Sequence, residues 1–448
     1  MKDKTSKLTE GPIAKTLFLM TLPMLLATMG MVIFNITDTF FVGKLGTMPL
    51  AAMTYTFPVV MLISNLAHGL GIGTSALISR AIGEGDSHKV QQLTTSSIIL
   101  AITLVLILVV TGMSTIEAVF RSLGADDTVL PMIKDYMQIW YGGVIFVLFP
   151  IIGNNAIRAT GDTKTPSIVM GLAALLNFIF DPLLIFGIGP FPALGIKGAA
   201  TATVVARLTT FVVAIYVLYF REKMLTLHGF DFRKIWTWWK DILYIGLPTA
   251  GTRMIIPISV AIITRLISSF GPNAVAGFGV ASRIEFFALV GVVSLASVLG
   301  PFIGQNLGAK RFDRIKTSLT YSYRFSIVSG LFTGVALAIF AKPISAIFND
   351  SPGVVSVSVL YLLIVPSSYT LQGVVMLSSI SLNVFHKPFT ASLLSILQMF
   401  ILYIPLAYLL SILWGIKGIF IALAIANFTI GVIAKFVVSH ELTKLESL

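Results

Sequence analysis

Long hydrophobic stretches alternate with short polar breaks along almost the whole chain. Residues 96–116, for example, include no charged side chain, and about 20 apolar residues are enough for a helix to cross a bilayer. Helices satisfy their own backbone hydrogen bonds in lipid, whereas open strand edges do not. The pattern predicts an all-α integral membrane protein with twelve transmembrane helices, at 13–41, 48–80, 91–116, 130–155, 165–187, 195–220, 239–268, 274–303, 317–340, 354–383, 389–411 and 416–438.

The distribution of charged residues predicts which ends of the helices face the cytoplasm. Hydrophobic residues make up 56% of the 448 residues and charged residues only 11%, with a net charge of +12. In a soluble protein this charge would suggest nucleic acid, but here the basic residues lie mainly in short loops. With the N-terminus inside, about 20 Lys and Arg fall on the cytoplasmic side and about 6 on the other. We expect no nucleic-acid partner, cytoplasmic N- and C-termini, and a bacterial-type inner (plasma) membrane.

The second half of the chain repeats landmarks of the first half, at an offset of about 225 residues that later becomes about 220. The repeat predicts an N-lobe at 1–225 with helices 1–6 and a C-lobe at 226–448 with helices 7–12, joined by a basic cytoplasmic loop at about 221–240. Six spans per repeat give both lobes one orientation, so we expect a pseudo-two-fold axis along the membrane normal and a central cleft. The matching positions are Pro23 with Pro248, Gly46 with Gly271, Gly83 with Gly308, Gly195 with Gly415 and Gly198 with Gly418.

Two aspartates, Asp38 and Asp181, lie inside predicted helices of the first half, and the repeat places Ile263 and Ile404 at the corresponding positions. An ionisable group in hydrocarbon costs about 2.5 to 3.5 kcal/mol on insertion scales, so such residues usually handle ions or substrates. The alternatives are an interfacial Asp38 that reaches water and an Asp181 near a helix end beside the outer loop. The missing counterparts favour a functional role.

A chemical role follows from the neighbours of these acids. Asp38 is predicted to bind and release a proton, since burial disfavours the charged form of a carboxyl. Asn177 lies one helical turn before Asp181, on the same face, so this pair is suited to share a proton, a water or a small cation. Na+ held by Asp38, Asn177 and Asp181 is the alternative to H+. Pro23 removes a backbone hydrogen bond from the first helix and is the predicted hinge.

Five arginines fall within or at the edges of spans, and we expect them to reach the interface or to pair locally. Arg283 is expected to form a structural pair with Glu285. The five are Arg207, Arg253, Arg265, Arg283 and Arg324.

Several classes of protein are excluded by what the sequence lacks. It has no cysteine, which rules out disulfides, thiolate metal sites and a cysteine nucleophile. It has neither an H-E-x-x-H nor a G-x-S-x-G motif. The glycines at 69–73 lie in an apolar helix without the strand or lysine of a phosphate loop, and favour close helix packing. We expect a secondary transporter rather than an enzyme, with no cofactor and no resident metal.

Several segments together resemble the multidrug and toxic compound extrusion (MATE) family over essentially the whole chain. They are Pro23 with Asp-Thr-Phe-Phe-Val-Gly at 38–43, Ala-Leu-Ile-Ser-Arg-Ala-Ile-Gly at 76–83, Arg-Ala-Thr-Gly-Asp-Thr-Lys-Thr-Pro at 158–166, Gly-Ala-Ala-Thr-Ala-Thr at 198–203 and Ser-Arg-Ile-Glu at 282–285. Within the family the chain looks like the DinF-like branch, whose coupling acids lie on the first and fifth helices.

The resemblance implies a monomeric antiporter in the lipid bilayer that exports lipophilic, mostly cationic small molecules against H+ or Na+, the coupling ion. It also implies a cavity around Asp38, Asn177 and Asp181, lined by Asn35, Tyr136, Asn154 and Thr203. A flippase for lipid-linked precursors of the same superfamily is an alternative, but such proteins tend to have more spans and a strongly cationic cavity. A major-facilitator-type transporter is another, but 80–86 lack the G-x-x-x-D-R-x-G-R expected after its second span.

Overall fold

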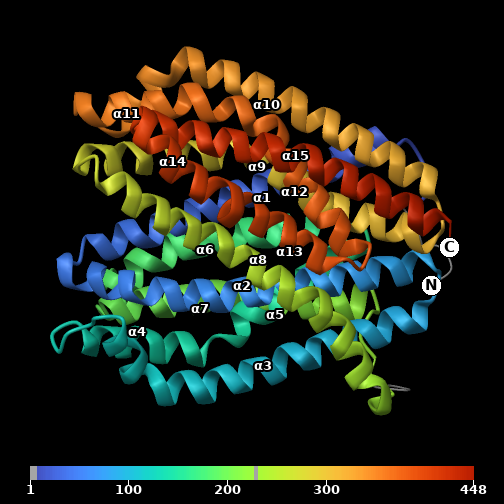
Figure 1. Ribbon diagram of the computed structural model, residues 1–448. Coiled ribbons are helices and arrows are strands. Elements are labelled where there is room, and N and C mark those ends of the chain that lie inside the picture. Colours follow the sequence, from blue (N-terminus) through green and yellow to red (C-terminus); the bar gives the residue numbers. More distant parts are fainter. Residues whose placement is uncertain (1–7, 227–230, 448) are drawn as a thin grey trace. The chain divides into compact units, whose positions relative to one another are not determined.

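The computed structural model describes residues 8–226 and 231–447, except for the side chains of Ile33, Asn35, Ile36 and Phe232. Within these ranges the chain folds into helices and contains no strand (Figure 1). The first half comprises α1 Ile13–Gly43, α2 Thr47–Gly83, α3 Ser87–Ser122, α4 Leu130–Gly142, α5 Ile145–Ala159, α6 Lys164–Phe186, α7 Ile196–Tyr216 and the π-helical η1 Val217–Arg221.

The second half follows a similar order. It comprises the short η2 Phe232–Lys234, α8 Ile235–Ser268, α9 Pro272–Gly308, α10 Phe312–Phe348, α11 Pro352–Ile364, η3 Val365–Ser368, α12 Tyr369–Val384, α13 Pro388–Ile396, the π-helical η4 Leu397–Tyr403, α14 Ile404–Trp414 and α15 Ile416–Glu446. Eleven described helical stretches are long and apolar enough to span a membrane, and α4 with α5 makes a twelfth. The predicted all-α membrane fold with twelve spans is therefore confirmed.

The fourth span is broken, whereas the sequence predicted one continuous helix at 130–155. α4 and α5 meet at an angle of 46°. At the junction, a Cβ on Gly143 would lie 2.3 Å from the Val204 side chain of α7. The glycine therefore allows the bent backbone to approach α7 more closely than any other residue would. Hydropathy could not reveal the break, because no polar or charged residue separates the two segments at Gly142, Gly143 and Val144.

The two halves repeat their backbone as well as their sequence. α2 and α9 each have 37 residues, and each follows a glycine with positive φ, 116° at Gly46 and 95° at Gly271. Gly195 and Gly415 both have φ of 57° and precede α7 and α15. Only glycine adopts these conformations readily. The axis that relates the two lobes stays a prediction.

Contacts within the described chain group its residues into two compact units, 22–250 in the first and 8–21 with 251–447 in the second. The first part of α8 belongs to the first unit because small residues bring it against α2, where a Cβ on Gly69 would lie 2.4 Å from the Gly246 carbonyl oxygen. This is the close packing predicted for the glycines at 69–73. The domain boundary at 225/226 rests on the sequence repeat and stays a prediction.

The segment before α1 is attached to the second unit by hydrogen bonds. Gln305 Oε1 accepts from the Leu8 backbone N–H at 3.3 Å. Arg314 donates to the carbonyl oxygens of Leu8, Glu10 and Gly11 at 2.9 to 3.1 Å. α1 thus starts in one unit and continues into the other, and the change falls at 21/22, beside Pro23.

Candidate functional site

Two buried carboxylates are the central feature of the first unit. Asp38 on α1 is 6% exposed and Asp181 on α6 is 0% exposed, so neither reaches the solvent as the alternative interpretations required. Asp38 Oδ1 and Asp181 Oδ2 have no hydrogen-bond partner among the described residues. Leaving a buried acceptor unsatisfied costs about 1 to 3 kcal/mol, which marks both atoms as positions for a proton, an ion or a ligand.

Asn177 supports Asp181 as its position one turn earlier predicts. Its amide Nδ2 donates to Asp181 Oδ1 at 3.0 Å, and its own Oδ1 is buried without a described partner. Asp38, Asn177 and Asp181 therefore each present one free buried oxygen. Oxygen acceptors of this kind suit a proton or a hard cation. The described residues contain no cluster of three or more His, Cys, Asp or Glu that would hold a metal ion.

Aromatic contacts hold α1 against α6 next to these oxygens. The Phe41 ring lies 6.1 Å from Phe178 and 6.3 Å from Phe186, measured between centroids. Phe178 directly follows Asn177, and Phe41 lies about one turn beyond Asp38. The ring contacts therefore place the part of α1 that carries Asp38 beside the part of α6 that carries Asn177 and Asp181. The two carboxylates consequently interact electrostatically.

The other described residues predicted to line the cavity are buried on neighbouring helices, and Tyr136 interacts with the pair of acids. Tyr136 on α4 is buried and lies close enough to Asp38 and Asp181 to interact electrostatically with both. Asn154 on α5 and Thr203 on α7 are buried as well, and α7 packs against α4, α5 and α6. The Thr203 hydroxyl has no described partner. The Asn35 side chain lies outside the described residues.

The corresponding positions of the second half carry no acid. Ile263, which the repeat aligns with Asp38, is fully buried, and Ile404, which aligns with Asp181, is partly buried. The polar cluster therefore belongs to the first unit alone.

The expected pair of Arg283 with Glu285 does not form, and this prediction is wrong. Glu285 instead accepts hydrogen bonds from the Tyr361 hydroxyl and, at 3.0 Å, from Gln372 Nε2, while Arg283 is exposed. Residues two apart on a helix point to different sides, so the spacing itself argues against the pair.

One arginine behaves differently from the other four in spans. Arg253, Arg265, Arg283 and Arg324 are exposed, whereas Arg207 on α7 is not. Its Nε is buried without a described partner, and its guanidinium lies 4.8 Å from the centre of the Phe34 ring. Phe34 is one turn before Asp38, so this cation also lies in the first unit's interior. Its position in the sequence does not distinguish it from the other four arginines.

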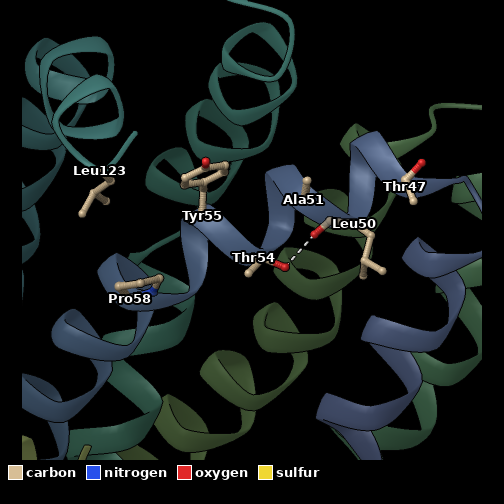
Figure 2. Close-up of a pocket in the computed structure, with 7 residues that line it drawn as sticks. All are labelled: Thr47, Leu50, Ala51, Thr54, Tyr55, Pro58 and Leu123. Atoms are coloured by element: carbon tan, nitrogen blue, oxygen red, sulfur yellow. Dashed lines mark hydrogen bonds between the residues drawn. The ribbon is translucent and has the colours of Figure 1, made fainter. Parts of the chain in front are cut away.

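A surface cleft of about 520 Å³ in the first unit is a less suitable site. Figure 2 shows its lining residues, with the Thr54 hydroxyl directed at the Leu50 backbone oxygen, to which it donates at 2.8 Å. No lining residue carries a charge at neutral pH, and none belongs to the carboxylate cluster. The residues are Thr47, Leu50, Ala51, Thr54, Tyr55, Pro58 and Leu123.

The segment at 158–166 forms a structural junction rather than part of this cluster. Asp162 accepts hydrogen bonds from the backbone N–H of Thr165 at 3.0 Å and from its hydroxyl at 2.6 Å. Arg221 of η1 forms an ion pair with the same carboxylate. Asp162 thus caps the start of α6 and fixes it to the end of η1.

Asp162→Asn is expected to reduce stability by about 1 kcal/mol, or about 2 °C in the thermal midpoint. Burial opposes ionisation of Asp162, but the hydrogen bonds from Thr165 and the charge of Arg221 outweigh it, so the pKa of this carboxyl is below its ordinary value of 3.8. A lowered pKa stabilises the fold above about pH 4 and loses its effect as the pH falls further. Thermal unfolding should be measured from pH 8 to pH 3 for purified wild type and Asp162→Asn. The thermal midpoints of the two proteins should converge as the pH falls.

Asp127→Asn is the matched control, since the side chain of Asp127 is 81% exposed where it pairs with Arg121. Exposed pairs contribute little, so its midpoint should follow the wild type at every pH. A difference between wild type and Asp162→Asn that persisted unchanged at pH 3 would contradict the assigned role of the charge.

The sequence profile of the MatE family matches residues 23–183 and again 248–409. The chain belongs to the MATE family. The two matched stretches start 248 − 23 = 225 residues apart, the same offset as the internal repeat. The protein is thus a membrane transporter of a family that includes multidrug exporters, built from two related halves.

Similar proteins cover nearly all of the chain. A protein named FAD transporter from Shewanella oneidensis is 38% identical over 432 residues, which are 96% of this chain and 95% of that protein. The probable multidrug resistance protein YoeA of Bacillus subtilis is 25% identical over 91% of this chain and 89% of that protein. The crystal structure of the Vibrio cholerae MATE transporter VcmN in the bent form has a TM-score of 0.92 at 31% identity, covering 99% and 98% of the two chains.

Proposed function

We propose that this MATE transporter is a secondary antiporter that exports organic small molecules in exchange for protons. The observation that carries the proposal is the set of free buried oxygens on Asp38, Asn177 and Asp181. A carboxylate buried without a partner is costly when charged, so a proton on Asp38 or Asp181 relieves that cost. The protein works as a monomer in a bacterial-type inner membrane, with both termini cytoplasmic.

Transport requires that the proton favour one conformation over the other. In the outward-open state, protonation of Asp38 removes its charge, changes its electrostatic interaction with Asp181, and lets α1 bend at Pro23. The bending of α1 changes the site around Asp38, and the cargo is released. The reverse step returns the proton to the cytoplasm and re-exposes the free oxygens to new cargo.

Two cargo classes are supported by different observations. The relatives named as multidrug resistance proteins and the acids of the first unit favour lipophilic cations. The Shewanella oneidensis relative named FAD transporter favours a flavin dinucleotide, because it is 38% identical over 96% of this chain.

The coupling ion is tested with purified protein in liposomes loaded with FAD or with ethidium, a lipophilic cation. A pH gradient alone should drive transport of the preferred cargo, and a Na+ gradient at equal pH and clamped potential should not. Liposomes without protein provide the control. Transport driven by the Na+ gradient alone would replace H+ by Na+ at Asp38, Asn177 and Asp181, since oxygen ligands also suit that ion.

A further inference from the structure

Arg207 is a partly buried cation, with an enclosed Nε and no counter-ion among the described residues. Within 8–226 and 231–447 it forms no ion pair, although Arg80, Arg121 and Arg221 of the same unit each pair with a carboxylate. Its Nε is shielded from solvent and has no described acceptor. An unpaired charge in a membrane interior is expensive and is retained mainly for function.

Thr203 presents a second free donor on the same face of α7. It lies four residues before Arg207, about one turn away, and its buried hydroxyl has no described partner. Two other threonines of this helix donate to backbone carbonyl oxygens, Thr201 to Lys197 at 2.8 Å and Thr210 to Arg207 at 2.6 Å. Two adjacent donors therefore lack acceptors.

The acids of the site do not supply those acceptors. Asp38 lies one turn beyond Phe34 on α1, and the Phe34 ring is 4.8 Å from the Arg207 guanidinium. No ion pair joins Arg207 to Asp38 or Asp181 among the described residues, and both acids keep a free oxygen. The first unit thus contains separate groups for a positive and a negative partner.

We propose that Arg207 and Thr203 bind an anionic group, a phosphate or a carboxylate, on the exported cargo. Guanidinium binds such oxyanions through paired hydrogen bonds, and the neighbouring hydroxyl donates a further one. Phe34 covers the guanidinium on one side and provides an aromatic surface for an attached ring system. The inference rests on the proposed export function and assigns the cargo to phosphate- or carboxylate-bearing aromatic compounds.

Riboflavin and flavin mononucleotide test the inference, because they share one ring system and differ by a phosphate. Equilibrium dialysis of the purified protein in detergent, without any ion gradient, measures both dissociation constants. Wild type should bind flavin mononucleotide at least about tenfold more tightly than riboflavin, and R207Q should lose that preference. R207K should keep part of it, and R324Q, an exposed arginine in α10, should keep all of it.

Both dissociation constants are measured on the same preparation of each variant. A partial loss of folded protein affects both measurements equally and therefore does not change their ratio. If R207Q does not fold, R207K and Thr203→Val replace it, and each should reduce the ratio. An equal affinity of wild type for both flavins, or an unchanged ratio in the variants, would overturn the proposal.

A lipid headgroup could also supply a phosphate, and a further arm of the experiment separates this source. Adding phosphatidylglycerol to the micelles should leave the preference for flavin mononucleotide unchanged. Its loss on adding the lipid would assign Arg207 to a headgroup and overturn the cargo assignment. The two proposals fail separately, because dialysis without a gradient does not depend on proton coupling.

Discussion

Asp38→Asn is expected to reduce proton-driven export by about 100-fold while leaving the fold intact. The amide has nearly the shape of the carboxyl but cannot gain or lose a proton, so protonation no longer shifts the balance between conformations. Because the charged form of a buried carboxyl is costly, its replacement does not destabilise the helix. The measurement is transport in liposomes under a pH gradient, with the thermal midpoint of the same preparation.

Asp350→Asn is the matched control, since Asp350 is exposed in the loop between α10 and α11. It should transport at the wild-type rate. Substrate-induced proton release, measured in weakly buffered detergent solution, should be present in wild type and Asp350→Asn and absent in Asp38→Asn. Export by Asp38→Asn at the wild-type rate would rule out Asp38 as the coupling group.

Gly418→Ala is expected to destabilise the protein by about 3 kcal/mol or more, at the upper end of overpacking costs. The added Cβ would lie 2.0 Å from the Leu410 carbonyl oxygen, and at Gly198 the corresponding Cβ would lie 2.3 Å from the Leu184 carbonyl oxygen. Both obstacles are backbone atoms, so neither can rotate away. Gly198→Ala should therefore produce a similar loss, and both midpoints should fall by about 5 °C or more.

Gly171→Ala provides the control for this pair. Gly171 lies inside α6 with nothing within 4 Å of its ideal Cβ, and alanine is the better helix former. Its midpoint should equal or slightly exceed that of the wild type. Unchanged midpoints in both Gly198→Ala and Gly418→Ala would mean that the helices separate easily at these contacts.

The number of spans could be predicted from the sequence, because the length of an apolar stretch is what a bilayer requires. The residues at which the helices begin and end could be predicted less well from the sequence. α10 extends over Phe312–Phe348, beyond the predicted 317–340 at both ends, because neither the charged residues at 312–316 nor Lys342 and Pro343 stop the helix. The break between α4 and α5 depends on how closely Gly143 approaches Val204, which is a contact distant in sequence.

The acids of the candidate site could be found because the repeat supplies an internal comparison, with Ile263 aligned to Asp38 and Ile404 to Asp181. The hydrogen bond between Asn177 and Asp181 followed from helical spacing alone. Arg207 could not be separated from the other arginines, since its burial depends on Phe34 of another helix. The only local signal was the spacing of four residues to Thr203.

The matching glycines of the two halves have an evolutionary consequence. Gly195 and Gly415 keep the same φ, and Gly198 and Gly418 meet the same kind of backbone obstacle, although Asp38 and Asp181 have no acidic counterparts. A tandem duplication of a six-helix ancestor accounts for this pattern. Both halves share the glycine-dependent backbone geometry, whereas the acidic pair is present in the first half alone, so the shape of a half does not require the charge of the candidate site.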